Sequence, residues 1–229
     1  MAAHTAGALR VRDVFGTAER APEWLGRARS AGVHAHEVTE RAAASLSETV
    51  TPQGIVAVCD LPATTVRDAL ADRPPLVAVL LGISDPGNAG TVVRVADAAG
   101  AGAVLFAGDT VDPYNGKAVR ASTGSLFHLG VARDRDAGAV LDECRRAGLR
   151  LVGADGAADA DLDEADRRGD LGAPTAWVFG GEAHGLSAHP EHNDLDLVLR
   201  VPVHGRAESL NLATAAAVCL YASARAQRS

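Results

Sequence analysis

The side chains best suited to chemistry gather in three glycine-containing segments of the C-terminal half, over residues 85–94, 179–187 and 202–213. Each segment follows an apolar run that is typical of a buried strand. These runs span residues 76–81, 175–179 and 195–201. In an open α/β sheet, ligands bind in the loops at the carboxyl ends of the strands. We therefore predict that the three segments build one composite site.

The first segment offers an asparagine and an arginine near the start of a helix. Asn88 is predicted to lie in the loop, and Arg94 about one turn inside a helix over residues 91–99. Backbone N–H groups at a helix N-terminus are suited to binding a phosphate. A tight turn around Asn88 with a surface arginine would explain the same residues without any site.

The second and third segments add a carboxylate, a hydroxyl and an amide. Gly180 and Gly181 would let the backbone approach a ligand closely, and Glu182 would then orient other side chains. The alternative is a plain bend with a solvated carboxylate. Ser209 and Asn211 open a helix after a proline and a glycine, where they would also serve as ordinary helix caps.

The three segments resemble the three motifs of the SpoU (TrmH-like) family of RNA ribose methyltransferases, within the SPOUT superfamily. The resemblance extends from about Leu76 to Tyr221 and includes the order and spacing of the motifs. It implies an α/β fold with a mostly parallel sheet and a C-terminal trefoil knot. It also implies S-adenosylmethionine as methyl donor, a ribose 2′-hydroxyl of RNA as acceptor, and a homodimer. Ribosomal RNA is favoured as substrate, with transfer RNA as the alternative.

The resemblance also assigns roles to the site residues. Arg94 corresponds to the essential catalytic residue, and Asn88 orients either that arginine or the substrate. A guanidinium is an awkward general base because its pKa lies above about 12, so stabilisation of the developing alkoxide stays open beside it. Glu182, Ser209 and Asn211 complete the predicted catalytic set. The residues implied to hold the adenosyl ligand, mainly through backbone groups, are Gly180, Gly181, Val201, Pro202, Leu210 and Asn211.

A smaller match covers residues 117–128, which resemble a stretch that follows the second strand in many enzymes of the family that act on ribosomal RNA. Lys117 is the only lysine of the chain, and Arg120 would share its helical face. Together with Arg94, these two residues are predicted to contact RNA. A solvated helix face explains Lys117 and Arg120 equally well.

The composition is that of a globular protein from a reducing compartment. The 229 residues are 47% hydrophobic and 22% charged, which suffices for a sizeable core. Aromatic residues make up only 3%, which argues against base stacking as the mode of RNA binding. The three cysteines lie far apart without a CxxC pair, so we expect neither disulfides nor a metal site. The sequence shows neither an apolar run of membrane-spanning length nor a signal peptide, so we expect the protein in the cytoplasm.

The net charge of −7 opposes a nucleic-acid partner, because binding phosphates requires positive charge. Much of the acidity lies in residues 155–170, which we expect to form a solvated surface away from RNA. The charge keeps open a non-catalytic RNA-binding or ribosome-assembly protein that retains the fold. The absence of GxGxxG and GxxxxGK[ST] argues against Rossmann and P-loop enzymes.

Two prolines in residues 72–75 suggest a linker between two domains. Residues 1–73 are predicted to form a small α/β RNA-binding-like domain, and residues 76–229 the methyltransferase domain. The stretch 46–58 resembles the end of the RNA-binding domain that precedes the catalytic domain in many SpoU enzymes. That domain normally opens with a further strand and helix, so we expect it to be truncated at its start.

The last predicted helix, over residues 210–225, is apolar around most of its surface. A helix of this kind must be buried on more than one side. We therefore predict a homodimer whose interface includes this helix and the helix that starts at Thr91. Burial under the chain's own N-terminal domain is the alternative.

Overall fold

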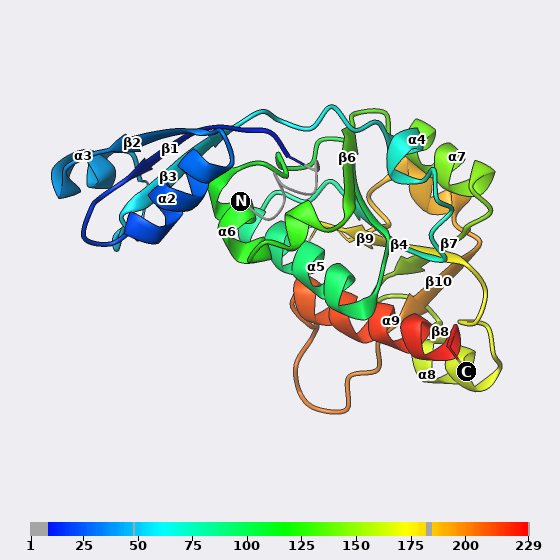
Figure 1. The fold of residues 1–229 in the computed structure, drawn as a ribbon. Coiled ribbons are helices and arrows are strands. Elements are labelled where there is room, and N and C mark those ends of the chain that lie inside the picture. The colour runs from blue at the N-terminus through cyan, green and yellow to red at the C-terminus, as the bar shows by residue number, and fades with distance from the viewer. Residues whose placement is uncertain (1–8, 48, 182–184, 229) are drawn as a thin grey trace. The chain divides into compact units, whose positions relative to one another are not determined.

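The computed structural model describes residues 9–47, 49–181 and 185–228. Its internal contacts divide the chain into two units, Met1–Ala63 and Thr64–Ser229 (Figure 1). The prediction placed the division at residues 72–75. The contacts divide the chain earlier because the short helix α4, Val66–Ala69, packs against strand β6 and helix α7 of the second unit.

The first unit is a small mixed sheet with a helix on one face. Its strands are β1 (Val11–Gly16), β2 (His34–Glu37) and β3 (Ile55–Cys59), in the order β2-β1-β3. β1 pairs parallel with β2 and antiparallel with β3. Helix α2, Pro22–Ser30, buries Leu25 and Ala28 against Val14 of the sheet, and α3 spans Glu40–Ser45.

The second unit contains a sheet of seven strands in the order β6-β5-β4-β9-β7-β10-β8. All of its strand pairs are parallel, which confirms the predicted fold class. The strands are β4 (Leu76–Leu81), β5 (Ala103–Ala107), β6 (Gly130–Asp134), β7 (Arg150–Ala154), β8 (Ala160–Asp161), β9 (Thr175–Gly180) and β10 (Leu197–Arg200). The central strands are buried on both faces, as their uninterrupted apolar sequences require.

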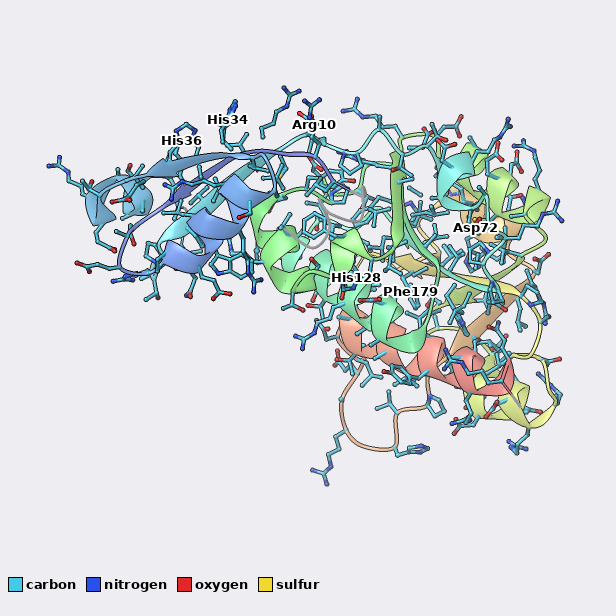
Figure 2. The ribbon with its side chains drawn as sticks, in the orientation of Figure 1. Arg10, His34, His36, Asp72, His128 and Phe179 are labelled. Atoms are coloured by element: carbon cyan, nitrogen blue, oxygen red, sulfur yellow. The ribbon has the colours of Figure 1, made fainter. Side chains whose placement is uncertain are left out.

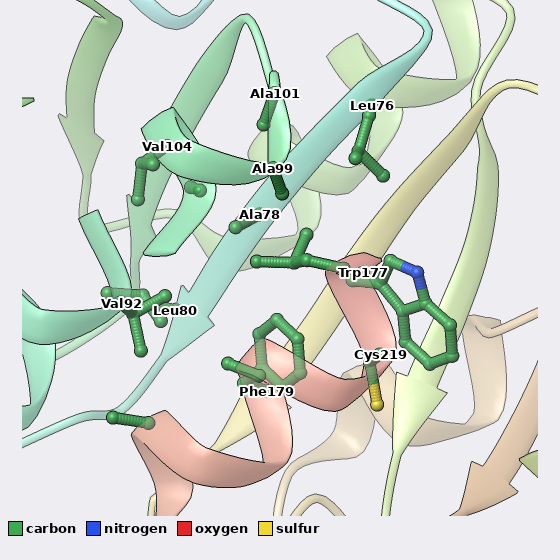
Figure 3. Packing of buried hydrophobic residues seen from close by; sticks show 14 of the residues in the cluster. Leu76, Ala78, Leu80, Val92, Ala99, Ala101, Val104, Trp177, Phe179 and Cys219 are labelled. Atoms are coloured by element: carbon green, nitrogen blue, oxygen red, sulfur yellow. The ribbon is translucent and has the colours of Figure 1, made fainter. Parts of the chain in front are cut away.

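Helices cover both faces of this sheet. One face packs against α5 (Pro86–Ala99), α8 (Leu162–Arg167) and α9 (Leu212–Ala226), with α6 (Gly116–Ser122) lying against α5. Figure 3 shows Trp177 and Phe179 of β9 packed on this side beside Cys219 of α9. The other face is covered by α4 and α7 (Ala137–Arg146). Two 3-10 helices span Ser125–Phe127 and Pro190–Asp194.

The bounds of several elements differ from the prediction: β10 is shorter than the predicted run 195–201, and α9 begins at Leu212 and not at residue 210. Helix α5 begins at Pro86, so Asn88 lies in its first turn and not in a loop. The reason is that Asp85 caps the helix and proline fits the first helical position. Strand β6 extends to Asp134, because its residues pair with the whole of β5.

Helix α9 packs against the sheet and against α5 and α8, and part of its surface stays exposed. Trp177 Nε1 donates a hydrogen bond of 2.9 Å to Ser223 Oγ, and Ala216 and Cys219 are fully buried. Val218 and Tyr221 remain 39% and 52% exposed. In the part of the chain that the structure describes, no helix is long and apolar enough to cross a membrane.

Candidate active site

A cavity of about 670 Å³ opens at the carboxyl ends of three neighbouring strands. Its wall includes the last residues of β7, β9 and β10, which are Ala154, Gly180 and Arg200. This is where an open parallel sheet is expected to bind a ligand.

The second and third sequence segments meet at this cavity. Gly180, Gly181, Val201, Ser209, Leu210 and Asn211 all line it. Pro202 follows Val201 in sequence but is not among the described residues of the wall. Glu182 lies outside the described residues.

The glycines of the second segment allow the chain to fold back on itself. The N–H of Gly185 donates to the carbonyl of Gly181 at 2.9 Å, and Gly185 has a φ of +63°. A Cβ on Gly180 would lie 2.6 Å from the carbonyl carbon of Gly185. Only a residue without a side chain fits this close backbone approach.

Asn211 connects the third segment to the first. Its Oδ1 caps α9 by accepting from the N–H groups of Ala213 at 3.0 Å and Thr214 at 3.3 Å. Its Nδ2 donates to Asn88 Oδ1 at 3.1 Å, across 123 residues of sequence. The N-termini of α5 and α9 therefore meet at the edge of the cavity.

Lys117 belongs to α6, and its side chain reaches Asp85 at the start of α5. The Asp85 carboxylate accepts from the N–H groups of Gly87 at 3.1 Å and Asn88 at 3.2 Å. Lys117 Nζ donates to Asp85 Oδ1 at 2.6 Å. The hydrogen bond from Lys117, followed by that from Gly87, lowers the pKa of Asp85 below its ordinary value.

The two predicted arginines lie outside the cavity of their own chain. Arg94 is exposed on α5, six residues beyond Asn88, and Arg120 is exposed in the last turn of α6. Neither belongs to the described cavity wall. The structure thus brings Asn88 to the cavity edge through Asn211, but leaves Arg94 and Arg120 on the surface.

Several residues of the wall were missed by the sequence analysis. Asp155 and Gly156 follow β7 and belong to the wall, although residues 155–170 were expected to form a surface away from RNA. Asp155 accepts from the N–H groups of Ala157 at 2.9 Å and Leu186 at 3.3 Å. Glu208 also lines the cavity. The sequence signal for these two residues is an Asp-Gly pair directly after the apolar stretch that forms β7.

Arg200 belongs to the cavity wall, and its guanidinium is hydrogen-bonded to the loop that follows β7. It donates to the carbonyls of Ala158 at 3.1 Å and Asp159 at 3.0 Å. Within residues 9–47, 49–181 and 185–228, no three His, Cys, Asp or Glu side chains are grouped so that they could hold a metal ion.

Comparison with known proteins gives two family matches. Residues 75–221 match the SpoU rRNA Methylase family, and residues 2–65 match the domain described as RNA 2′-O ribose methyltransferase substrate binding.

Among characterised relatives, the chain is 36% identical over 194 residues to the 23S rRNA (guanosine(2553)-2′-O)-methyltransferase RlmP of Bacillus subtilis, covering 83% of this chain and 72% of that protein. It is 38% identical over 184 residues to the 23S rRNA (uridine(2479)-2′-O)-methyltransferase of Streptomyces viridochromogenes, covering 76% of this chain and 61% of the relative. The crystal structure of the SpoU methyltransferase AviRb from Streptomyces viridochromogenes with the cofactor AdoMet superimposes with a TM-score of 0.83 at 32% identity, covering 100% of this chain and 87% of that one.

Proposed function

The chain belongs to the SpoU rRNA methylase family, and on that premise we propose that it methylates a ribose 2′-hydroxyl of 23S ribosomal RNA with S-adenosylmethionine as donor. The observation that carries the proposal is the cavity at the ends of β9 and β10, where glycines of the second motif meet Ser209, Leu210 and Asn211 of the third. Family membership also implies the C-terminal trefoil knot. Because its substrate is ribosomal RNA, we place the enzyme in the cytoplasm.

The cavity fits the methyl donor in size and in chemistry. Its volume of about 670 Å³ is that of a site for a drug-sized ligand. Gly180, Val201 and Leu210 would hold the adenosyl group through their backbones, and Asp155 and Glu208 offer carboxylates for its polar and cationic parts. When bound, the donor supplies a methyl group on a sulfonium, which is already a good leaving group.

The protein must then align the hydroxyl and stabilise the charge that develops on its oxygen. An exposed guanidinium keeps its proton at neutral pH and can donate paired hydrogen bonds to a phosphate or an oxyanion. We assign this role to Arg94, which is exposed on α5. Arg94→Lys keeps the charge but loses the paired geometry, so it should retain less than about a tenth of the wild-type rate.

A homodimer would supply Arg94 to the cavity of a neighbouring copy. Two observations support this: Arg94 lies outside the described wall of its own cavity, and Val218 and Tyr221 expose apolar surface on α9. In a two-fold dimer the contact is reciprocal, so each α5 would serve the other cavity. Light scattering at micromolar concentration should give twice the monomer mass in an active preparation.

Mixing two inactive variants tests whether the site is shared between subunits. Arg94→Ala removes the guanidinium, and Gly180→Ala distorts the cavity wall. If the site is shared, each mixed dimer carries one intact site, and an equimolar mixture recovers about a quarter of the wild-type rate. If each chain uses its own Arg94, the mixture stays inactive.

The function itself is tested with tritiated methyl donor and ribosomal RNA. Wild-type protein should label the RNA, Arg94→Ala should not, and digestion should release a 2′-O-methylated nucleoside. Calorimetry with S-adenosylmethionine provides the companion measurement. Donor binding without any RNA labelling would overturn the proposal, and absence of both would favour a non-catalytic RNA-binding protein.

A further inference from the structure

The only lysine of the chain lies across the first turn of helix α5. Lys117 Nζ is 2.6 Å from Asp85 Oδ1. A Cβ on Gly87 would lie 3.0 Å from Lys117 Cε and 3.3 Å from its Nζ. The glycine therefore leaves the space in which the lysine side chain reaches the carboxylate.

Asp85 links this lysine to the start of α5. Its carboxylate accepts from Lys117 and from the N–H groups of Gly87 and Asn88, so one side chain joins α6 to the first turn of α5. Without Lys117 the carboxylate would lose the partner that holds it in place against the first turn of α5.

Asn88 continues the connection toward the cavity. It is the third residue of α5, and its Oδ1 accepts from Nδ2 of Asn211. Asn211 lines the cavity and caps α9. A continuous series of contacts thus runs from Lys117 to the cavity wall, and the same helix carries Arg94.

The backbone of α6 packs directly against α5, so these contacts can fix the first turn of α5. A Cβ on Gly90 would lie 2.3 Å from the carbonyl oxygen of Ala118, so α5 and α6 are in backbone contact one residue away from Lys117. Ala118 is itself buried. The base of the lysine side chain is therefore fixed relative to α5 before any RNA binds.

We propose that Lys117 is a positioning residue for methyl transfer, acting through Asp85 on the first turn of α5 and not through a phosphate of the RNA. The inference rests on the proposed function, and it replaces the phosphate contact that the sequence suggested for Lys117. The ammonium already has a carboxylate partner at hydrogen-bond distance. Because 58% and 41% of the two side chains are exposed, the pair adds little to stability, and its loss should leave the fold intact.

The kinetic test uses Lys117→Met, Asp85→Asn, their double variant and the conservative Lys117→Arg. Asparagine preserves the helix cap while removing the charge. We expect Lys117→Met to lower kcat about tenfold, since small displacements of catalytic groups cost about that much or more, with KM for RNA unchanged. Lys117→Arg should restore most of kcat. In the Asp85→Asn background, Lys117→Met should cause no further loss.

A phosphate contact gives the opposite pattern. Lys117→Met would then raise KM for RNA by the same factor in both backgrounds, and the salt dependence of RNA binding would weaken by about one unit of slope. That result would overturn the proposal. Equal melting temperatures for all variants exclude a general loss of structure as the cause.

A second measurement does not depend on activity. Hydrogen exchange at the amides of Gly87 and Asn88, which Asp85 caps, should be faster in Lys117→Met than in wild type, while amides near the end of α5 stay unchanged. Unchanged exchange at both amides would overturn the role of Lys117. If wild-type protein labels no RNA, the proposed function fails, and the exchange rates still decide whether Lys117 holds the start of α5.

Discussion

Replacing Gly180 with alanine would place a methyl group against backbone atoms that cannot move aside. The new Cβ would lie 2.6 Å from the carbonyl carbon of Gly185, 2.7 Å from its oxygen and 2.7 Å from the nitrogen of Leu186, whereas ordinary contacts are 3.4–4 Å. Overpacking of this kind costs about 1–3 kcal/mol. For a unit of this size, that corresponds to a melting temperature lower by roughly 2–12 °C.

The same substitution should also weaken binding of the methyl donor, because Gly180, Gly181 and Gly185 all line the cavity. We expect calorimetry to show at least about a tenfold loss of affinity for S-adenosylmethionine. Gly156→Ala is the matched control for stability. Gly156 lines the same cavity, but a Cβ there would meet nothing within 4 Å, so its melting temperature should change by no more than about 2 °C.

Two results would refute this reasoning. A melting temperature of Gly180→Ala equal to that of wild type would mean that the backbone at Gly180, Gly185 and Leu186 adjusts without cost. An unchanged donor affinity, in a variant that is clearly less stable, would mean that this part of the wall does not hold the donor.

Three further predictions concern other parts of the site and core. In Asn211→Ser, the serine still caps α9, but its side chain is too short to reach Asn88. We therefore expect kcat to fall at least about tenfold, with little change in melting temperature. An unchanged kcat would contradict a role for this hydrogen bond. Asp155→Asn removes a carboxylate from the cavity wall. Calorimetry should show that it weakens binding of the cationic methyl donor about fivefold more than binding of the demethylated product, whose sulfur is uncharged. An equal effect on both ligands would argue against an electrostatic contribution. Burial raises the pKa of Cys144 and of Cys219 to about 12, while both thiols ionise near pH 9 once unfolded. The free energy of unfolding should therefore fall as pH rises from about 9 toward 12, and urea titrations should show a smaller fall in Cys219→Ala.

The strands and their order along the chain were largely readable from sequence. β4 has the bounds that its apolar run predicted, because a strand buried on both faces leaves no polar position to interrupt the pattern. Helix α5 starts earlier than predicted, because proline and glycine at positions 86 and 87 are also typical of a turn. Asp85 followed by proline is in fact a capped helix start.

The composition of the cavity wall was harder to predict, because it depends on strand order. Strand β7 lies between β9 and β10, and this placement brings Asp155 and Gly156 next to the second and third motifs. Alternation of strands and helices reveals parallel pairing but not which strands are neighbours. The hydrogen bond between Asn88 and Asn211 could not be predicted either, because it joins side chains at the starts of two helices that lie 123 residues apart in the sequence.

The position of β9 in the sheet has a consequence for how the protein is made. β9 separates β4 from β7, although it follows both in the chain, and the described neighbours of β7 are β9 and β10. During synthesis, β4, β5 and β6 can associate early, but the apolar edge of β4 stays unpaired until residues 175–180 have left the ribosome. Pairing over such long sequence separations is slow, and exposed strand edges promote aggregation. Nascent chains that stall before Thr175 should therefore be insoluble, while chains released after the last helix should fold.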